Sequence, residues 1–244
     1  MFNLDKLFKA KSNQGISNKP IFQQSYPSFS PFDQKALEIL CEKLPPNFVA
    51  LEVGSWLGQG STQVLINAAM KKNGIIYCVD TWRGNPNVAK HQKIVKEYDV
   101  LGTFLYNVSN AGAQNIVKPL VMDSHAASKV IANEMFDLIF IDADHSYAST
   151  KLDIQSWKDK VIKGGILCGH DCEARASKIG LDLLHNSKEF DTIEGDENFA
   201  AFHPGVVLAT FESFGDKHQL FAEKILQLDD GRPGRSTIWY FDGM

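Results

Sequence analysis

The residues best placed to do chemistry in this sequence lie where short apolar runs end. One such run lies within residues 50–61 (ALEVGSWLGQGS), where an acid and three spaced glycines precede a helical pattern. Glycine lacks a Cβ, so this turn can bring the backbone close to a ligand. The candidate ligand-binding residues of the turn are Glu52, Gly54, Ser55, Gly58, Gly60 and Ser61. The alternative is a turn that binds nothing.

The glycine spacing narrows the class of ligand. The sequence has G-x-x-x-G-x-G, whereas dinucleotide-binding turns have G-x-G-x-x-G. A second acid, Asp80, ends the next apolar run at 75–79. An ionised aspartate can accept both hydrogen bonds of a ribose diol, although Asp80 could instead cap the following loop. Acids at the ends of two neighbouring strands favour a nucleoside-containing ligand.

A third group of polar residues follows two later apolar runs. Asp142 and His145 come after the run 137–142, and His170 and Asp171 come after 165–169. The carboxyl ends of parallel strands meet at one edge of a sheet, so these four side chains can converge. For His145, the alternative is a capping or packing role at the start of the next helix. Asp144 could bind a ligand, orient His145 or face water.

The elements that must position these residues alternate along the chain. We expect strands at 48–53, 75–79, 116–121, 137–142 and 165–169, with helices near 61–71, 89–108, 124–133 and 148–161. This alternation predicts an α/β fold with a doubly wound, mostly parallel sheet. A helix at 205–214 and two β-rich runs, 224–228 and 236–241, predict a C-terminal antiparallel hairpin at the sheet edge.

The sequence suggests one domain with two additions. Residues 1–31 are predicted to be an N-terminal extension, and a helical pattern begins at 32. The domain then spans 32–244. Within it, 173–203 is predicted to be an insertion that carries a helix at 174–184 and shapes a substrate pocket. The long segment 84–110 is expected to cover the other side of that pocket.

Composition excludes several classes of function. The formal net charge of −4 and a pI near 6.0 argue against a protein that binds nucleic-acid backbones. No apolar run approaches the roughly 18 residues that span a bilayer, and the N-terminus lacks a signal-peptide core. We therefore expect a cytoplasmic protein without a membrane partner. Cys168 and Cys172 flank His170 and Asp171 but lack the spacing of a zinc knuckle.

Five motifs in order give the sequence a family resemblance. They are LEVG at 51–54 with its glycines, VDTW at 79–82, FIDADHSY at 140–147, GGILCGHD at 164–171 and HPGV at 203–206. With these motifs, residues 32–244 resemble class I S-adenosylmethionine-dependent methyltransferases. The branch resembled includes macrolide sugar O-methyltransferases and proteins related to cephalosporin hydroxylase. The resemblance implies a Rossmann-like fold.

The resemblance also implies where S-adenosylmethionine binds. The glycine turn would take the methionine and ribose part, Asp80 the ribose hydroxyls, and Glu52 would orient the cofactor from below. Adenine would lie near Asp123 and Ser124. Trp82 would wall the pocket, or else belong to the core. The implied cofactor-binding residues are Glu52, Gly54, Ser55, Gly58, Gly60, Ser61, Asp80, Thr81, Trp82, Asp123, Ser124 and Asp142.

The same resemblance implies roles at the acceptor end. Relatives bind Mg²⁺ at positions that match Asp142, His170 and Asp171, and carry a histidine base at the position of His145. Imidazole is a poor ligand for Mg²⁺. Three alternatives therefore remain for this position: a Mn²⁺ site, a weak Mg²⁺ site or a site without a metal. The implied acceptor is a small hydroxylated molecule such as a sugar, a glycoside or a catechol-like ring. A homo-oligomer formed through residues 1–30 is a further expectation.

Three other functions compete with O-methylation. A protein of the same fold could bind the cofactor without catalysis, and the substitution at His170 keeps that alternative open. A nicotinamide-dependent oxidoreductase would share the sheet, but its glycine spacing differs. N- or C-methylation is also open, although the sequence lacks an Asn-Pro-Pro-Tyr signature.

Overall fold

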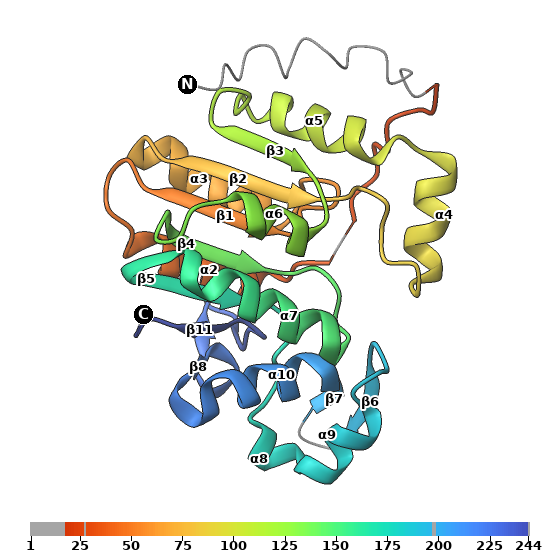
Figure 1. Ribbon diagram of the computed structural model, residues 1–244, viewed down its shortest axis with the longest axis vertical. Coiled ribbons are helices and arrows are strands. Elements are labelled where there is room, and N and C mark those ends of the chain that lie inside the picture. The colour runs from red at the N-terminus through yellow and green to blue at the C-terminus, as the bar shows by residue number, and fades with distance from the viewer. Residues whose placement is uncertain (1–17, 27, 197–198, 244) are drawn as a thin grey trace.

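A computed structural model describes residues 18–26, 28–196 and 199–243. Its centre is a seven-stranded sheet of order β3-β2-β1-β4-β5-β11-β8 (Figure 1). The parallel strands are β1 (Val49–Val53), β2 (Ile75–Asp80), β3 (Val117–Val121), β4 (Phe136–Ile141) and β5 (Val161–Gly169). Strand order reverses beside β1, where open α/β sheets form ligand crevices. The predicted doubly wound, mostly parallel sheet is confirmed.

Alternate residues of the strands face two separate cores. On β1, Ala50 packs with the helices α2 (Pro31–Glu42) and α3 (Ser61–Lys72), while Leu51 faces the opposite cluster. That second cluster includes residues of α7 (Tyr147–Trp157) and α10 (Pro204–Phe214). Figure 1 shows α7 in front of the sheet and α2 and α3 behind it. Because both faces are covered, the central strands β1 and β4 are mainly apolar, as expected for a parallel sheet.

The predicted helices occur with changed boundaries. The expected helix 89–108 is two helices, α4 (Ala89–Glu97) and α5 (Val100–Asn110). The break has a local cause, because the Asp99 side chain accepts a hydrogen bond from the Gly102 backbone and caps α5. The expected helix 124–133 is the shorter α6 (Ser124–Val130), and a short 3₁₀ helix (Lys158–Lys160) follows α7.

The C-terminal antiparallel element is present, but the predicted pairing of its two runs is wrong. The strand β11 (Trp239–Phe241) pairs antiparallel with β5 and with β8 (Gln219–Leu220). The run 224–228 contributes β9 (Leu226–Gln227), which pairs with β10 (Pro233–Gly234) instead. The chain reverses directly after β9, where Leu228 donates to the Arg232 carbonyl, so the nearest strand is its partner.

The segment 173–203 forms a small unit beside α10. It contains α8 (Ala176–Ile179), α9 (Leu181–Ser187) and the antiparallel pair β6 (Ile193–Asp196) and β7 (Phe199–Phe202). The expected single helix 174–184 is interrupted at Gly180, whose φ is +100°. Leu184 and Phe202 bury their side chains in the same core as α10.

The described N-terminal segment contacts the domain at several points, beginning with Lys19, which donates to the Val95 carbonyl. The Phe22 backbone donates a hydrogen bond to Thr103, and the Tyr26 backbone donates to Gln59. An oligomer surface was expected at 1–30. Residues 1–17 of that segment lie outside the described residues. In the described part of the chain, no helix is both long and apolar enough to cross a bilayer.

Candidate active site

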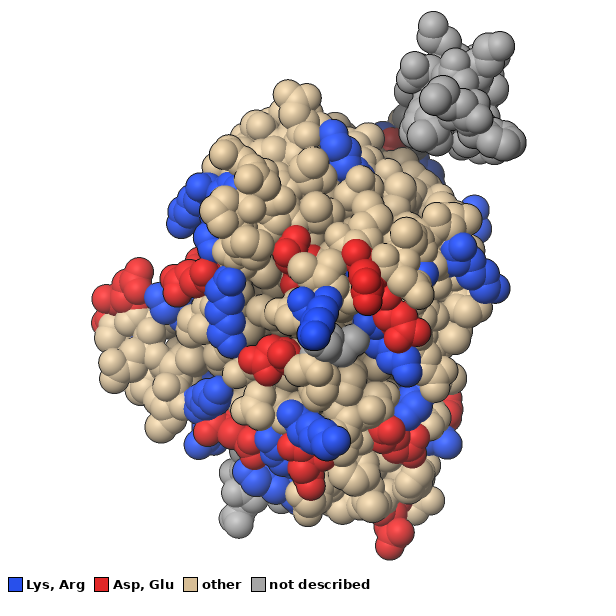
Figure 2. Space-filling model, turned by 60° about the vertical axis from the view of Figure 1, so that its left-hand side comes forward, with Lys and Arg blue, Asp and Glu red and all other residues tan. Residues whose placement is uncertain are grey.

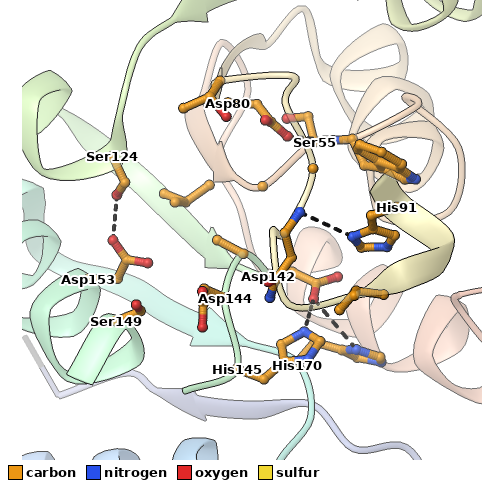
Figure 3. Close-up of a pocket in the computed structure, with 18 of the residues that line it drawn as sticks. Ser55, Asp80, His91, Ser124, Asp142, Asp144, His145, Ser149, Asp153 and His170 are labelled. Atoms are coloured by element: carbon orange, nitrogen blue, oxygen red, sulfur yellow. Dashed lines mark hydrogen bonds and ion pairs between the residues drawn. The ribbon is translucent and has the colours of Figure 1, made fainter. Parts of the chain in front are cut away.

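A cavity of about 630 Å³ opens at the carboxyl ends of the parallel strands (Figure 3). This volume is typical of small-molecule sites. None of the described residues that line it is Lys or Arg, whereas seven are aspartates. This excess of carboxylates favours a cationic ligand over an anionic one. The lining aspartates are Asp80, Asp123, Asp142, Asp144, Asp153, Asp171 and Asp191.

Gly54 allows the ends of β1 and β4 to approach each other. Its φ is +90°, and a Cβ there would lie 2.0 Å from the Asp142 carbonyl oxygen. The Asp142 backbone donates to the Val53 carbonyl at 2.8 Å. Any side chain at position 54 would push the two strands apart, so a glycine is needed for packing as well as for ligand approach.

Asp80 lines the cavity and also holds the glycine turn. One carboxylate oxygen accepts from the Trp56 backbone at 2.8 Å, and the other accepts from the Trp82 backbone at 2.6 Å. Both tryptophans have positive φ values, 45° and 52°. Burial raises the pKa of Asp80, and the backbone donors oppose that shift. The loop-capping role of Asp80 is therefore confirmed, and its ligand-binding role stays a prediction.

Four of the residues proposed to bind the cofactor do not line the cavity. Glu52 is fully buried and accepts hydrogen bonds from Ser61 and Thr62, both at 2.7 Å, so it fixes the first turn of α3. Burial raises the pKa of Glu52. Trp82 is a core residue whose ring packs on Phe104. The remaining two are Gly58 and Gly60, whereas Gly54, Ser55, Ser61, Asp80, Thr81, Asp123, Ser124 and Asp142 do line it.

One end of the cavity lies at Asp123 and Ser124, the first residues after β3 and its loop. Asp123 caps α6 by accepting from the Ala126 backbone at 3.0 Å. Ser124 donates to Asp153 on α7 and accepts from the Trp157 indole at 2.8 Å. Burial raises the pKa of Asp153 to about 6. Sequence reasoning missed Asp153. Its place next to Ile154 and near Trp157, on the apolar side of a helix, could have indicated a buried acid.

The other end of the cavity brings together the predicted acids and histidines. One oxygen of Asp171 lies 3.0 Å from His170 Nδ1, and its second oxygen lies 3.1 Å from His145 Nε2. Asp142 lies 3.9 Å from a nitrogen of each of these histidines (Figure 3). The convergence expected from the strand ends therefore occurs.

Two further acids extend this group. Asp33, on α2, lies 3.2 Å from His170 Nε2, and Asp191, in the insertion, lies 2.9 Å from His145 Nδ1. Sequence reasoning missed both, because neither belongs to a motif. Burial lowers the pKa of both histidines, but the surrounding carboxylates outweigh it and raise both pKa values well above 6.5. Burial also opposes ionisation of Asp33, yet His170 holds its pKa at about 2.

His203 is another residue of this cluster, and sequence reasoning left it without a role. Its ring lies 4.7 Å from the His145 ring, and it lines the cavity. The HPGV motif was the signal that pointed to it. From the opposite side, residues of the segment 84–91 and of the N-terminal segment enclose the same end. They include Gly84, Asn85, Pro86, Val88, His91, Tyr26, Ser28 and Phe29.

The predicted metal ligands converge at the acidic end of the cavity. One donor atom from each of Asp142, His170 and Asp171 lies within 4.8 Å of the others. His170 Nε2 lies 3.2 Å from Asp33 without a hydrogen bond, and the oxygens of Asp171 lie beside His170 and His145. Mg²⁺ prefers oxygen ligands in near-ideal octahedral geometry, and one of the three donors here is an imidazole nitrogen. The metal site therefore stays a prediction.

Comparison with known proteins adds a family and a fold. A family model described as a methyltransferase domain matches residues 51–172, which are 122 of the 244 residues. No curated protein matches the sequence.

Three solved structures resemble the chain across 89% of its length. A protein from Corynebacterium glutamicum is 13% identical, with a TM-score of 0.53 over 83% of that chain. Cofactor-bound Rv0187 from MTB is 20% identical, with a TM-score of 0.51 over 82% of that chain. An rRNA-methylase candidate from Clostridium thermocellum is 9% identical, with a TM-score of 0.52 over its full length. At these identities the likeness shows the fold alone.

Proposed function

The chain belongs to the methyltransferase domain family and is a class I S-adenosylmethionine-dependent methyltransferase, and we propose that it methylates a hydroxyl group of a small acceptor. The acceptor class proposed is a sugar, a glycoside or a catechol-like ring. The observation that carries the proposal is the cluster around His145, which places an imidazole and several carboxylates in the cofactor cavity. An oxygen nucleophile needs such groups because its proton must leave.

The cofactor half of the cavity suits S-adenosylmethionine chemically. The bound cofactor supplies an electrophilic methyl group on a positively charged sulfur. Carboxylates line the cavity without a lysine or arginine among its described lining residues, which favours that positive charge. We propose that Asp80 binds the ribose hydroxyls, that Gly54 and Ser55 contact the methionine part, and that Asp123 and Ser124 lie beside the adenine.

At the acceptor end, we propose His145 as the residue that takes the hydroxyl proton. In the transfer, the sulfur–methyl bond breaks, an oxygen–methyl bond forms and the hydroxyl hydrogen leaves as a proton. Carboxylates raise the pKa of His145 well above 6.5, which makes it a stronger base than an ordinary histidine. Its Nδ1 faces Asp191, whose side chain is 45% exposed, so a proton can leave to solvent by this route before catalysis.

A small acceptor is favoured over a nucleic acid. Figure 2 shows Lys and Arg side chains intermingled with Asp and Glu on the face it presents, rather than gathered in one basic area. Proteins that bind nucleic-acid backbones concentrate positive charge on one face. The acidic cavity opposes a phosphate-bearing acceptor in the same way. No step in this proposal uses a metal ion.

Calorimetric titration of S-adenosylmethionine tests the cofactor site. Asp80→Ala should weaken binding strongly, while Asp182→Ala, at an exposed residue of α9, should not. Methyl transfer is then measured as S-adenosylhomocysteine released with methyl glucoside, catechol or a primary amine as acceptor. Turnover of a hydroxylated acceptor supports the proposal. Turnover of the amine alone would indicate N-methylation, and binding without any turnover would indicate a non-catalytic relative.

A further inference from the structure

Three aromatic rings from distant parts of the chain meet on one side of the cavity. They belong to Tyr26 in the N-terminal segment, Trp56 in the glycine turn and His91 on α4, and all three residues line the cavity. The His91 ring lies against the Trp56 ring, with 4.5 Å between centroids and 30° between planes. The Tyr26 centroid lies 5.9 Å from that of His91 and 6.3 Å from that of Trp56. We call these three residues the aromatic wall.

The loop before α4 holds His91 in one orientation. The Asn85 backbone donates a hydrogen bond to His91 Nδ1 at 3.3 Å. Asn85 is fixed in turn by Gln92, whose side chain donates to the Asn85 carbonyl at 3.0 Å. Gly84 lets the loop come close, because a Cβ there would lie 3.0 Å from His91 Cβ and 3.1 Å from the Trp56 ring. A backbone donor on one side and a ring on the other therefore hold His91.

These contacts also decide which nitrogen of His91 carries the hydrogen. A nitrogen that accepts from a backbone N–H presents a lone pair, so the ring hydrogen lies on Nε2. Burial lowers the pKa of His91, which agrees with a neutral ring. Nε2 has no hydrogen-bond partner among the described residues, and it is not one of the buried polar atoms that lack one. The Nε2–H group is therefore accessible and free to donate to a ligand.

His91 faces the acceptor end of the cavity rather than the ribose and adenine end. The charges of His145, Asp191 and Asp142 act on its pKa, and these residues belong to the acceptor end. In the view of Figure 3, Asp142 lies between His91 above and His145 and His170 below. Donors are scarce here, because the lining is rich in aspartates and none of its described residues is Lys or Arg. An acceptor oxygen therefore has few other side chains from which to accept a hydrogen bond.

We propose that His91 Nε2 donates a hydrogen bond to a second oxygen of the acceptor, next to the hydroxyl that is methylated. This inference rests on the proposed function. It narrows the acceptor to a molecule with two adjacent oxygens, such as a catechol or a vicinal diol of a sugar. The reacting oxygen already has to meet His145 and the methyl group, so a donor on the opposite side serves its neighbour. Tyr26 and Trp56 are positioning residues, because their rings hold the His91 ring.

Paired acceptors and a ring-for-ring substitution test the proposal. His91→Phe keeps a ring against Trp56 and removes the Nε2–H donor. The measured quantity is kcat/KM, for catechol against phenol and for methyl glucoside against its monodeoxy derivatives. In the wild type, loss of the oxygen next to the methylated one should lower kcat/KM about 10-fold, which corresponds to one hydrogen bond. In His91→Phe that difference should disappear, while S-adenosylmethionine affinity stays unchanged.

Two further variants separate this contact from a packing role. His91→Gln places an amide donor near the position of Nε2 and should restore the preference for two adjacent oxygens. His185→Phe, at an exposed histidine, is the matched control and should keep the wild-type preference. Circular dichroism reports whether each variant is folded.

Several results would overturn the proposal. They are a wild type that turns over both members of a pair equally, a preference that survives in His91→Phe, and a preference that His91→Gln does not restore. A fall in S-adenosylmethionine affinity in His91→Phe would place His91 beside the cofactor instead and would overturn the proposal as well. If the wild type turns over none of these acceptors, the proposed function itself has failed.

Ring-nitrogen NMR tests the His91 contact without turnover. At neutral pH the His91 ring should be neutral, with its hydrogen on Nε2. Catechol added to the protein loaded with S-adenosylhomocysteine, which carries no methyl group to transfer, should shift the Nε2 signal and leave Nδ1 nearly unchanged. A hydrogen on Nδ1 would overturn the assigned donor, and an Nε2 signal that catechol does not move would overturn the contact.

Discussion

Glu173 holds His203 with both of its carboxylate oxygens. One oxygen lies 2.7 Å from His203 Nδ1, and the other accepts from the His203 backbone at 3.1 Å. The two residues stand at the two ends of the segment 173–203, so their contact closes its base. The same contact fixes the His203 ring 4.7 Å from His145. The contribution of the insertion to the cavity therefore depends on this pair.

Glu173→Gln should loosen the insertion. The Glu173 side chain is 12% exposed. Burial lowers the pKa of His203, but the neighbouring acids raise it by more, so the pKa is raised overall. Loss of a hydrogen bond to a charged group should lower the free energy of unfolding by about 1.5–3 kcal/mol. Urea denaturation gives this number, and hydrogen exchange should accelerate in 188–195. The exposed Glu189→Gln is the control, and equal behaviour of both variants would contradict the prediction.

Gly54→Ala should abolish cofactor binding, whereas Gly164→Ala should not. Both glycines have positive φ values, 90° and 79°, so both substitutions strain the backbone by about 1–2 kcal/mol. Only at Gly54 would the added Cβ meet another atom, the Asp142 carbonyl oxygen at 2.0 Å, since nothing lies within 4 Å at Gly164. Calorimetry with S-adenosylmethionine separates the two effects. Similar affinities for the two variants would show that strand approach at Gly54 does not matter.

Asp153→Asn should stabilise the protein at neutral pH. Burial raises the pKa of Asp153 from 3.8 to about 6, so the folded state favours the protonated carboxyl. The contribution of this preference to the free energy of unfolding is fully present below pH 3.8. It is lost as pH rises through about 6. Asparagine stays neutral at every pH. The free energy of unfolding of Asp153→Asn should therefore be on the order of 3 kcal/mol higher than that of the wild type at neutral pH.

Urea denaturation at two pH values checks the Asp153 prediction. The difference between Asp153→Asn and wild type should be large at about pH 7.5 and small at about pH 4. Asp182→Asn, at an exposed position, controls for the loss of one negative charge. A stability difference that does not change with pH would contradict the assigned cause.

His145→Ala should separate cofactor binding from turnover. We expect unchanged S-adenosylmethionine affinity and a turnover rate about 10²–10⁴-fold lower, because general-base assistance is typically of that size. The raised pKa of His145 adds a pH signature, since the neutral imidazole forms only above the ordinary histidine range. The wild-type rate should therefore rise with pH above 6.5, and this dependence should be absent in the variant.

The same assays on His185→Ala, an exposed histidine of α9, provide the control. His185→Ala should keep the wild-type rate and pH profile. The acceptor is whichever hydroxylated compound the wild type turns over most rapidly. An equal fall in cofactor affinity and turnover in His145→Ala would indicate a structural role for His145.

The sequence by itself determined the sheet and the meeting of its strand ends. Apolar runs separated by helical patterns predicted the five parallel strands, and the acids and glycines after them lie at one edge as expected. The physical reason is local, because strand periodicity, glycine turns and caps act over a few residues. The same reasoning predicted that Asp142, His145, His170 and Asp171 would converge.

Only the tertiary structure decided what those residues touch. Asp33, Asp191 and His203 come from α2, the insertion and the start of α10, and no sequence spacing relates them to His170 or His145. The pairing of β11 with β8 rather than with the run 224–228 is likewise a long-range choice. Charge partners and edge-strand partners depend on packing between segments distant in the chain. That packing placed carboxylates beside both histidines and so raised the pKa of each.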